Sequence, residues 1–228
     1  MRSHQRLQQA QQNGHLEEIE LIYDQRGKFY DADDGLRADS SMDKLAKLNP
    51  AFDKPLGKVT AGNSAQITDG AAWLLLASED AVKKYELPVL GRRVDSQSSG
   101  LDPSQMGLGP VHAMAPILRR NQLDSGDIDN WEINEAFAAL VHACLRAWQD
   151  DAYCIQELGL EGAFSPIDEE RLNIDGGGVA IGHPVGASGA RIALHSLKTL
   201  QRSGQKRGMV SLCIGGGQGG AMLFERDV

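Results

Sequence analysis

Apolar residues recur along this chain with two different spacings, which together predict alternating helices and strands. After Pro110, which suits a first helical turn, four apolar residues recur at helical spacing: Val111, Met114, Ala115 and Leu118. Near the C-terminal end, apolar runs over 208–214 and 218–225 flank a glycine cluster and predict adjacent buried strands. Strands that alternate with helices of this length indicate an α/β sheet covered on its faces.

The remaining apolar and polar stretches place further elements around this pair of strands. In chain order, we expect a polar helix ended by Gly14, a short strand near Lys58, an apolar helix over 69–85 with Asp69 as its N-cap, a strand over 90–98, a strand over 130–133, a helix over 134–148 and a helix from Ala187 to Gly204. Residues 149–171 are the least regular part and resemble an insertion.

Composition and charge exclude several classes of protein. Hydrophobic residues make up 41% of the 228 and charged residues 24%, as in a soluble globular protein of one large or two small domains. The 23 basic and 31 acidic residues give a net charge of −8, which argues against a nucleic-acid or anionic-membrane surface. No apolar run approaches the roughly 20 residues that span a bilayer. The basic, glutamine-rich N-terminus resembles a transit peptide superficially, but a short polar helix is the simpler interpretation.

The three cysteines, at positions 144, 154 and 213, lack metal-site spacing and leave an odd count. We therefore expect free thiols, no metal and a reducing compartment, the cytoplasm.

Three short motifs place a reactive side chain where a strand or loop meets the next element. Asn134 begins NEAF directly after a strand, where it serves either as an N-cap or as a functional amide. His183 lies in a glycine-rich turn, GGGVAIGHPVGASGAR, and a structural histidine rarely needs so many glycines. Cys213 begins CIGGG, in which Gly215 offers a backbone N–H beside the sulfur; the alternative is an inert core thiol.

Together, a thiol, an imidazole and a carboxamide near free backbone N–H groups are the components of an acyl-transfer site. The thiol or the imidazole moves protons, while the amide and the N–H groups hold a developing oxyanion. The glycine-rich turns lack the G-x-G-x-x-G spacing of a dinucleotide site.

Four segments of the chain resemble, in family order, segments of the thiolase family of 3-ketoacyl-CoA and acetoacetyl-CoA thiolases. Three are the signatures NEAFAAL, GGGVAIGHPVGASGARI and CIGGGQGG, and VTAGNSAQITDGAA resembles the family's CoA loop. The resemblance covers essentially the whole chain and implies a thiolase-like α/β fold, with one sheet domain covered by helices plus part of a loop domain. Residues 1–68 correspond to the CoA-binding loop domain, 69–89 to the last helix of an N-terminal thiolase domain, and 90–228 to the C-terminal domain.

The resemblance also implies a role for each motif residue. His183 matches the histidine that activates a nucleophilic cysteine, and Cys213 matches the cysteine that shuttles a proton as acid and base. Asn134 matches the asparagine that orients a water, and this water and the histidine polarise the thioester oxygen of acetyl-CoA. The N–H of Gly215 matches one side of the other oxyanion hole. The implied reaction is Claisen condensation of acyl-CoA with acetyl-CoA, or thiolysis of a 3-ketoacyl-CoA in fatty-acid β-oxidation, with no covalently bound cofactor.

Two residues are implied as contacts for coenzyme A. The family's loop commonly carries a serine two residues after the asparagine of AGN, but Ala65 stands there in this chain, so Ser64 is the expected substitute. Arg37 is assigned to a phosphate of CoA, with a solvated surface arginine as the alternative.

Members of the family are nearly twice this length and carry the nucleophilic cysteine in an N-terminal half. Cys144 and Cys154 lie in the wrong segments to replace it. The chain is therefore expected to supply the acid/base cysteine, the histidine and the asparagine but not the nucleophile, and to be inactive alone. Expected partners are CoA, acetyl-CoA and acyl-CoA, further copies of the chain, or a segment that supplies the nucleophile. The helix over 69–85 is expected to expose an apolar patch, which usually marks an interface.

Two alternatives to a thiolase half-site remain open. The chain is either a non-catalytic CoA-binding or interaction module, or Cys213 itself acts as a nucleophile with His183 as its base and slowly hydrolyses thioesters.

Overall fold

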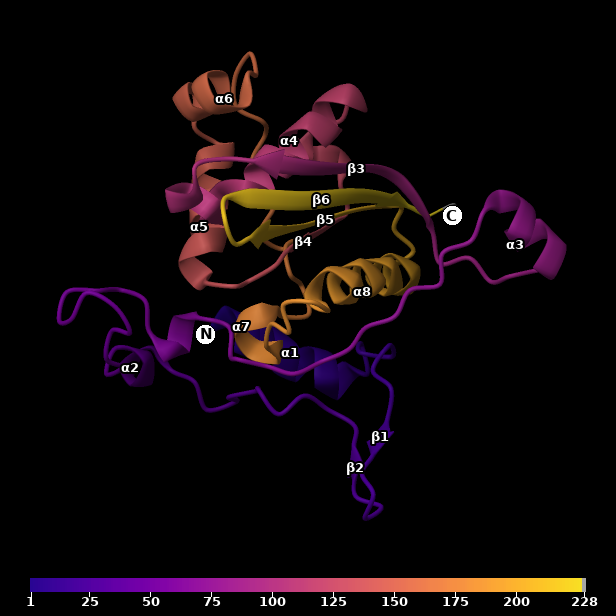
Figure 1. Cartoon of the computed structure of the whole chain (residues 1–228), viewed down its shortest axis with the longest axis horizontal. Helices are drawn as coiled ribbons and strands as arrows, with labels where there is room; N and C mark the ends of the chain where they lie inside the picture. Colours follow the sequence, from indigo (N-terminus) through magenta and orange to yellow (C-terminus); the bar gives the residue numbers. More distant parts are fainter. Residues whose placement is uncertain (227–228) are drawn as a thin grey trace.

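A four-stranded sheet forms the centre of the computed structural model, which describes residues 1–226. The strands lie in the order β3-β6-β5-β4 (Figure 1). Their bounds are Arg92–Gly100 for β3, Asn130–Ile133 for β4, Arg207–Ile214 for β5 and Gln218–Glu225 for β6. Strand β4 runs parallel to β5, whereas β6 is antiparallel to both β5 and β3. These four strands confirm the predicted strands of the C-terminal region.

Helices cover both faces of this sheet. Figure 1 shows α4 (Gly109–Arg120) and α5 (Ala138–Trp148) on one face and α8 (Ser188–Ser203) on the other. Because alternate side chains of a strand point to opposite faces, Met209 and Cys213 of β5 join the core under α4 and α5, whereas Val210 packs with residues of α8. The predicted α/β architecture is confirmed.

Glycines end the first and last long helices where the sequence predicted them. Helix α1 (Arg2–Asn13) ends at Gly14 with a φ of 68°, and α8 ends at Gly204 with a φ of 67°. Glycine adopts this left-handed conformation without a Cβ penalty. The predicted apolar face of α5 is also confirmed as buried, through Leu140, Val141, Cys144 and Trp148.

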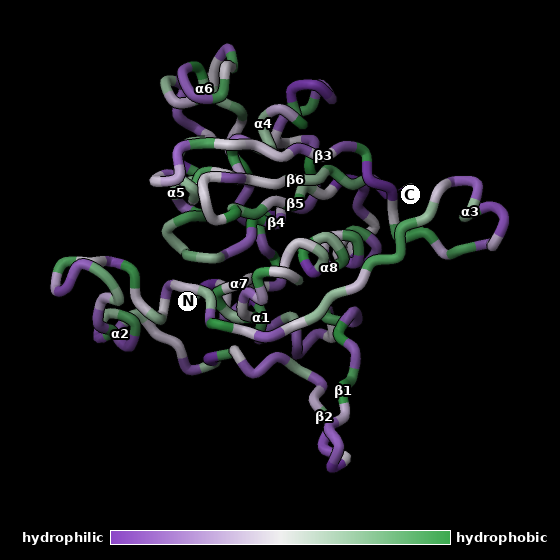
Figure 2. Tube along the Cα trace, viewed as in Figure 1, coloured by the Kyte–Doolittle hydropathy of each residue, from purple (hydrophilic) through white to green (hydrophobic). Residues whose placement is uncertain are grey.

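The segment over 69–85 departs from its predicted structure. The single helix capped by Asp69 is wrong, because residues 70–77 are extended and α3 covers only Glu79–Tyr85, with Ser78 as its N-cap. Trp73, Leu75 and Leu76 are each at least 85% exposed. Figure 2 shows this apolar stretch between the α8 region and α3. Consecutive apolar residues would face both sides of a strand, which is typical of a strand inside a sheet rather than of an amphipathic helix. No strand among residues 1–226 pairs with this segment.

Two other predicted elements also differ. No strand forms near Lys58; instead Thr60 caps a 3-10 helix over Ala61–Asn63, because local side chains satisfy the backbone there. The insertion over 149–171 contains a helix, α6 (Asp151–Leu158), whose N-cap is Asp150 and which ends at Gly159.

The first 68 residues lie mostly below α8 as drawn in Figure 1. Helix α1 packs against α7 (Gly178–Ile181), and the other regular elements of this region are short: β1 (Ile22–Tyr23), β2 (Phe29–Tyr30) and α2 (Met42–Leu45). Further 3-10 turns cover Pro103–Leu108 and Ser125–Asp127. Within residues 1–226, every helix is too short or too polar to cross a bilayer.

Candidate active site

The carboxyl ends of β4 and β5 meet at one edge of the sheet, and two of the predicted site residues lie there. Parallel pairing places Ile133 beside Ser211, so the residues that follow the two strands are neighbours. The backbone N–H of Asn134 donates to the Ser211 carbonyl at 2.9 Å, and Cys213 follows two residues later on β5. The topology therefore brings together two motifs that are distant in the sequence.

Asn134 and His183 are in direct contact. Asn134 Nδ2 lies 3.3 Å from His183 Nε2. Asn134 is buried, and its Oδ1 has no hydrogen-bond partner among residues 1–226. A buried amide oxygen is costly unless a water or a ligand supplies a donor, so this oxygen can hold a water beside the imidazole. The N-cap alternative for Asn134 is wrong, because Phe137 is the N-cap of α5.

The turn that carries His183 requires the glycine before it. Gly182 has a φ of 103°, and a Cβ there would lie 2.2 Å from Thr68 Oγ1. Thr68 Oγ1 accepts a hydrogen bond from the His183 N–H at 3.3 Å. Burial, and then the positive charge of Arg191, lowers the pKa of His183, so the imidazole is neutral at neutral pH.

Cys213 lies at the carboxyl end of β5 and is 7% exposed. Burial raises the pKa of this thiol, so it rests protonated. Its sulfur forms no hydrogen bond with Asn134 or His183 in the part of the chain that the structure describes. Gly215 is exposed at the start of the turn between β5 and β6 and has open space on its Cβ side, which leaves its backbone accessible.

Glu135 connects the glycine-rich turn to the N-terminal helix. Its carboxylate accepts hydrogen bonds from Ser3 Oγ at 2.6 Å, Asn173 Nδ2 at 3.2 Å and Val179 N at 3.3 Å. A Cβ on Gly177 would lie 2.6 Å from the Glu135 carboxyl carbon, so a larger residue there would displace this carboxylate. The second residue of NEAF therefore holds the turn that leads to His183.

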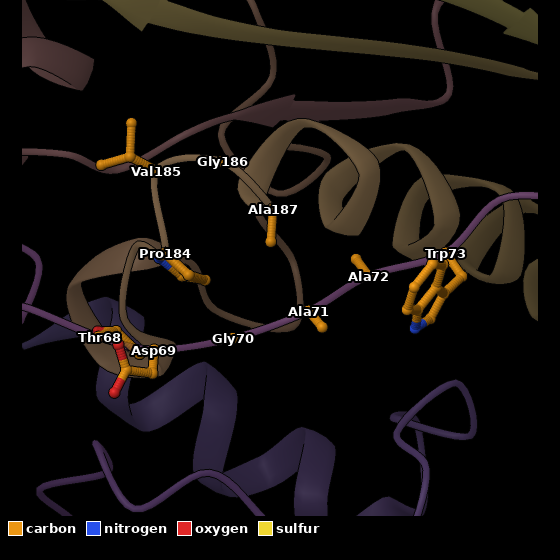
Figure 3. A pocket seen from close by; sticks show the side chains of 10 residues that line it. All are labelled: Thr68, Asp69, Gly70, Ala71, Ala72, Trp73, Pro184, Val185, Gly186 and Ala187. Carbon is orange, nitrogen blue, oxygen red and sulfur yellow. The ribbon is translucent and has the colours of Figure 1, made fainter.

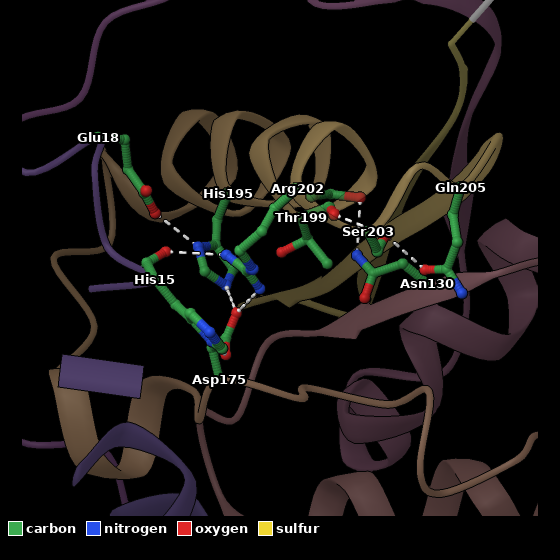
Figure 4. A network of polar contacts seen from close by, with 10 residues as sticks. His15, Glu18, Asn130, Asp175, His195, Thr199, Arg202, Ser203 and Gln205 are labelled. Carbon is green, nitrogen blue, oxygen red and sulfur yellow. Dashed lines mark hydrogen bonds and ion pairs between the residues drawn. The ribbon is translucent and has the colours of Figure 1, made fainter. Parts of the chain in front are cut away.

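A buried network of ion pairs anchors the same turn from behind (Figure 4). His195 Nδ1 lies 2.5 Å from Glu18 Oε1, and its Nε2 lies 3.4 Å from Asp175 Oδ2. Arg202 also pairs with Asp175, which directly precedes Gly176. Burial by itself lowers the pKa of His195, but the hydrogen bonds to Asp175 and Glu18 outweigh burial and raise it to about 10. His195 is therefore a cation that holds α8 to the N-terminal segment.

Two cavities are lined in part by residues of the first 73 positions. One, of about 390 Å³, lies between the extended segment Thr68–Trp73 and the turn Pro184–Ala187 (Figure 3). Gly70 approaches the Pro184 ring so closely that a Cβ on it would lie 2.7 Å from Pro184 Cγ. This cavity borders the residue that follows His183.

The other cavity, of about 340 Å³, is lined by Arg37, the residue predicted to contact a phosphate of CoA. Arg37 and Lys44 line it together with Ala61, Gln66 and Val179 of α7. Ser64 is absent from the lining, and its Oγ donates to the Thr60 carbonyl at 2.8 Å. The loop that carries Ser64 nevertheless lies beside NEAF, because Ala65 N donates to the Ala136 carbonyl at 2.9 Å. The structure thus places Arg37 at a cavity and leaves Ser64 in a turn.

The other two cysteines are core residues. Cys144 is 1% exposed and Cys154 is 0% exposed, and their sulfurs donate to the backbone carbonyls of Gly107 and Ala147. Burial raises the pKa of both thiols. All three cysteines are free, as predicted, and these two lack the exposure that a nucleophile needs.

Sequence reasoning missed several residues that position the site. Thr68, Glu135 and Ser188 contact His183 or the turn that carries it. Thr68 and Glu135 are distant from that turn in the sequence. Ser188 alone left a local signal, since it stands five residues after His183 at the first position of a helix. Thr68 and Glu135 left none, because their partners come from other segments.

Comparison with known proteins extends over the whole described chain. Residues 87–226 match the family model described as thiolase, C-terminal domain, and residues 1–80 match the one described as thiolase, N-terminal domain. The chain is 41% identical over 231 residues to a 3-ketoacyl-CoA thiolase of Cronobacter sakazakii, an alignment that covers 99% of this chain and 56% of that protein.

Two solved structures are similar in fold. Human mitochondrial 3-ketoacyl-CoA thiolase in complex with CoA aligns with a TM-score of 0.84 and 36% identity over 99% of this chain and 52% of that one. The dimeric peroxisomal thiolase of Saccharomyces cerevisiae aligns with a TM-score of 0.83 and 38% identity over 99% and 53%. The chain spans about half the length of the curated relatives it matches.

Proposed function

The chain belongs to the thiolase family, and from this premise we propose that it forms the acid/base half of a thiolase active site. The contact between Asn134 and His183, with Cys213 at the neighbouring strand end, carries the proposal. The reaction is the reversible thiolysis of a 3-ketoacyl-CoA by CoA into acyl-CoA and acetyl-CoA, in fatty-acid β-oxidation.

In the cleavage step, a thiolate attacks the 3-keto carbon and the bond between C2 and C3 breaks. The electron pair passes to the thioester oxygen of the departing acetyl-CoA as an enolate. His183 and a water held by Asn134 Oδ1 stabilise this oxygen, and each such donor contributes about 3 kcal/mol. The Cys213 thiol then donates its proton to C2 and releases acetyl-CoA. A raised pKa suits this step, because the thiol must be protonated beforehand.

In the transfer step, the Cys213 thiolate accepts the proton of the CoA thiol. The CoA sulfur attacks the acyl-thioester, and the N–H of Gly215 stabilises the oxyanion that forms. Collapse of this intermediate releases acyl-CoA and the thiolate that attacked in the cleavage step, and Cys213 is again a thiol. Protons and electron pairs balance over the two steps.

We assign the attacking thiolate to a segment outside residues 1–226. Cys144 and Cys154 are buried in the core, and Cys213 already has the acid/base role. The part of the family that this chain does not span is the natural source of that group.

We assign coenzyme A to the cavity lined by Arg37 and Lys44. Arg37 suits a phosphate of CoA, Lys44 adds a second cation that is paired with Asp39 on the same lining, and apolar Leu45 and Leu48 suit the pantetheine arm. The complex of the human relative with CoA agrees with a CoA-binding function for the family. Ser64 remains a secondary candidate at the same loop.

By analogy with the dimeric yeast relative, we also propose that the complete protein is a homo-oligomer, and a cytoplasmic location remains part of the proposal.

The decisive test is thiolysis of acetoacetyl-CoA by this chain alone and by a fusion that places the N-terminal half of the Cronobacter sakazakii relative before residue 1. We expect turnover only from the fusion, and its loss in the C213A and H183A variants of the fusion. Turnover by the chain alone contradicts the assignment of the nucleophile. An inactive fusion that folds and binds CoA contradicts the proposed reaction.

A non-catalytic CoA-binding module is the second candidate, and the cavity around Arg37 is the observation that favours it. Calorimetric titration of the chain with CoA separates the outcomes. Binding that is weakened by Arg37→Ala, together with an inactive fusion, supports the module, whereas no binding at millimolar CoA removes both proposals for this cavity. The third candidate, hydrolysis with Cys213 as nucleophile, is disfavoured by the burial and raised pKa of that thiol.

A further inference from the structure

His183 is held at both ring nitrogens by groups of known hydrogen-bonding direction. Asn134 Nδ2 lies 3.3 Å from Nε2 on one side, and Ser188 Oγ lies 2.6 Å from Nδ1 on the other. Ser188 Oγ in turn donates to the Pro184 carbonyl at 3.1 Å. The four groups form one chain of hydrogen bonds that crosses the imidazole.

The direction of each bond follows from the ends of this chain. At the Asn134 end an amide nitrogen only donates, so Nε2 must accept, and the hydrogen of the neutral imidazole lies on Nδ1. Ser188 Oγ then accepts from Nδ1, and its own hydrogen points to the Pro184 carbonyl, which only accepts.

Ser188 is itself held rigidly. It is fully buried at the first position of α8, and its backbone N–H and that of Ala187 donate to the same Pro184 carbonyl at 2.9 and 2.8 Å. The hydroxyl therefore has a fixed position relative to both the turn and the helix. No part of this arrangement depends on a bound substrate.

We infer that Ser188 is a positioning residue that selects the Nδ1–H tautomer of His183 and so keeps the Nε2 lone pair facing Asn134. The consequence for catalysis rests on the proposed function: Nε2 then carries the lone pair that takes the proton of an attacking thiol in place of the Asn134 hydrogen bond, and it afterwards donates to the substrate oxygen. The opposite tautomer places a hydrogen on Nε2 before the reaction and removes the base. A histidine held in the wrong tautomer loses catalytic rate by orders of magnitude in other triads.

The test is a long-range ¹H–¹⁵N correlation spectrum of the chain labelled at its histidines, in which the His183 signals are those lost in His183→Gln. In the unsubstituted chain we expect a protonated Nδ1 and an unprotonated Nε2 for His183 at neutral pH. In Ser188→Ala we expect loss of this pattern, with the hydrogen moving partly or wholly to Nε2. Ser196→Ala is the matched control, since it removes a buried hydroxyl of the same helix that bonds Asn130 and does not contact His183.

Two results overturn the inference: an unsubstituted His183 that is protonated at Nε2, or a Ser188→Ala variant that keeps the Nδ1–H pattern. The first is measured without any substitution at Ser188, so a misfolded variant still leaves a decisive spectrum. Unchanged His195 signals establish that a folded variant has been measured. Because the tautomer is observed without turnover, failure of the proposed reaction leaves this result intact, and failure of the tautomer assignment leaves the fusion assay unaffected.

Discussion

At the scale of single residues, the candidate site depends on positions where a side chain is absent as much as on those where one is present. Gly182 and Gly177 let the backbone pass within contact distance of Thr68 and Glu135, respectively. Those two polar residues then hold the turn that leads to His183. The reactive groups are ordinary in type, and their placement is what makes the site.

We expect Gly182→Ala to destabilise the chain by about 2 kcal/mol or more, because its φ of 103° disfavours any Cβ and Thr68 Oγ1 occupies the space. The contact between His183 and Asn134 should be lost as well. Urea unfolding measures the free energy, and the His183 signals report the contact. Gly189→Ala is the control, since a Cβ there meets nothing within 4 Å and should change stability by less than about 1 kcal/mol. Equal stabilities of the two variants contradict the explanation.

At the scale of elements, the predicted helices and strands of the C-terminal region are confirmed because their own residues determine them. Helix α8 has a glycine at its end, and β5 and β6 pair through a short turn, so local pattern is sufficient. The extended segment over 70–77 could not be assigned in this way. Its apolar residues suit either a helix face or a buried strand, and the choice depends on neighbours rather than on the segment.

The same limit applies to the candidate site. Asn134, His183 and Cys213 were found because each stands in a distinctive local pattern, and the first two are confirmed as neighbours. The roles of Thr68 and Glu135 depend on bonds to distant segments, which a single sequence does not display. The same is true of Ser64, whose hydroxyl bonds within its own turn.

The exposed segment over 70–77 should bind hydrophobic dyes and promote self-association, because it offers both apolar side chains and backbone outside any helix or sheet to another chain. We expect Leu75→Lys to reduce dye fluorescence and the oligomeric fraction in sedimentation while changing the unfolding free energy by less than about 0.5 kcal/mol. Leu56→Lys is the control, since Leu56 is 86% exposed but lies outside this segment. A large loss of stability in Leu75→Lys shows instead that the segment is packed.

At the scale of the whole molecule, buried charges join the first residues of the chain to α8. His195 contacts Glu18 and Asp175. The charges of Glu132 and His195 act on each other, and the charge of Arg191 also acts on Glu132. Breaking a buried pair by removing one partner typically costs about 3–5 kcal/mol. The network is therefore expected to determine how stability responds to pH.

The pKa of His195 is raised to about 10, so its contribution to stability is complete below pH 6.5 and decreases as pH rises toward 10. Between pH 7 and 8.5 we expect the unfolding free energy to fall by about 1.4 kcal/mol per pH unit. His195→Gln should be less stable at pH 7 and lose most of this pH dependence; the remainder near pH 7 comes from Glu132, since burial raises the pKa of its carboxyl to about 7. The buried thiols add a decrease of their own above about pH 8.5, so the comparison ends there. A flat curve for the unsubstituted chain contradicts a cationic His195.

The bond from Ser3 to Glu135 has a consequence for the order of events during synthesis. Helix α1 is synthesised before its partners at Glu135 and Gly177, which follow more than a hundred residues later in the chain. Contacts of such long sequence separation form slowly, since the loop between them must close first. The reactive edge of the sheet should therefore be among the last regions to become ordered, and cleavage within residues 1–13 should disable it without altering any residue that the reaction uses.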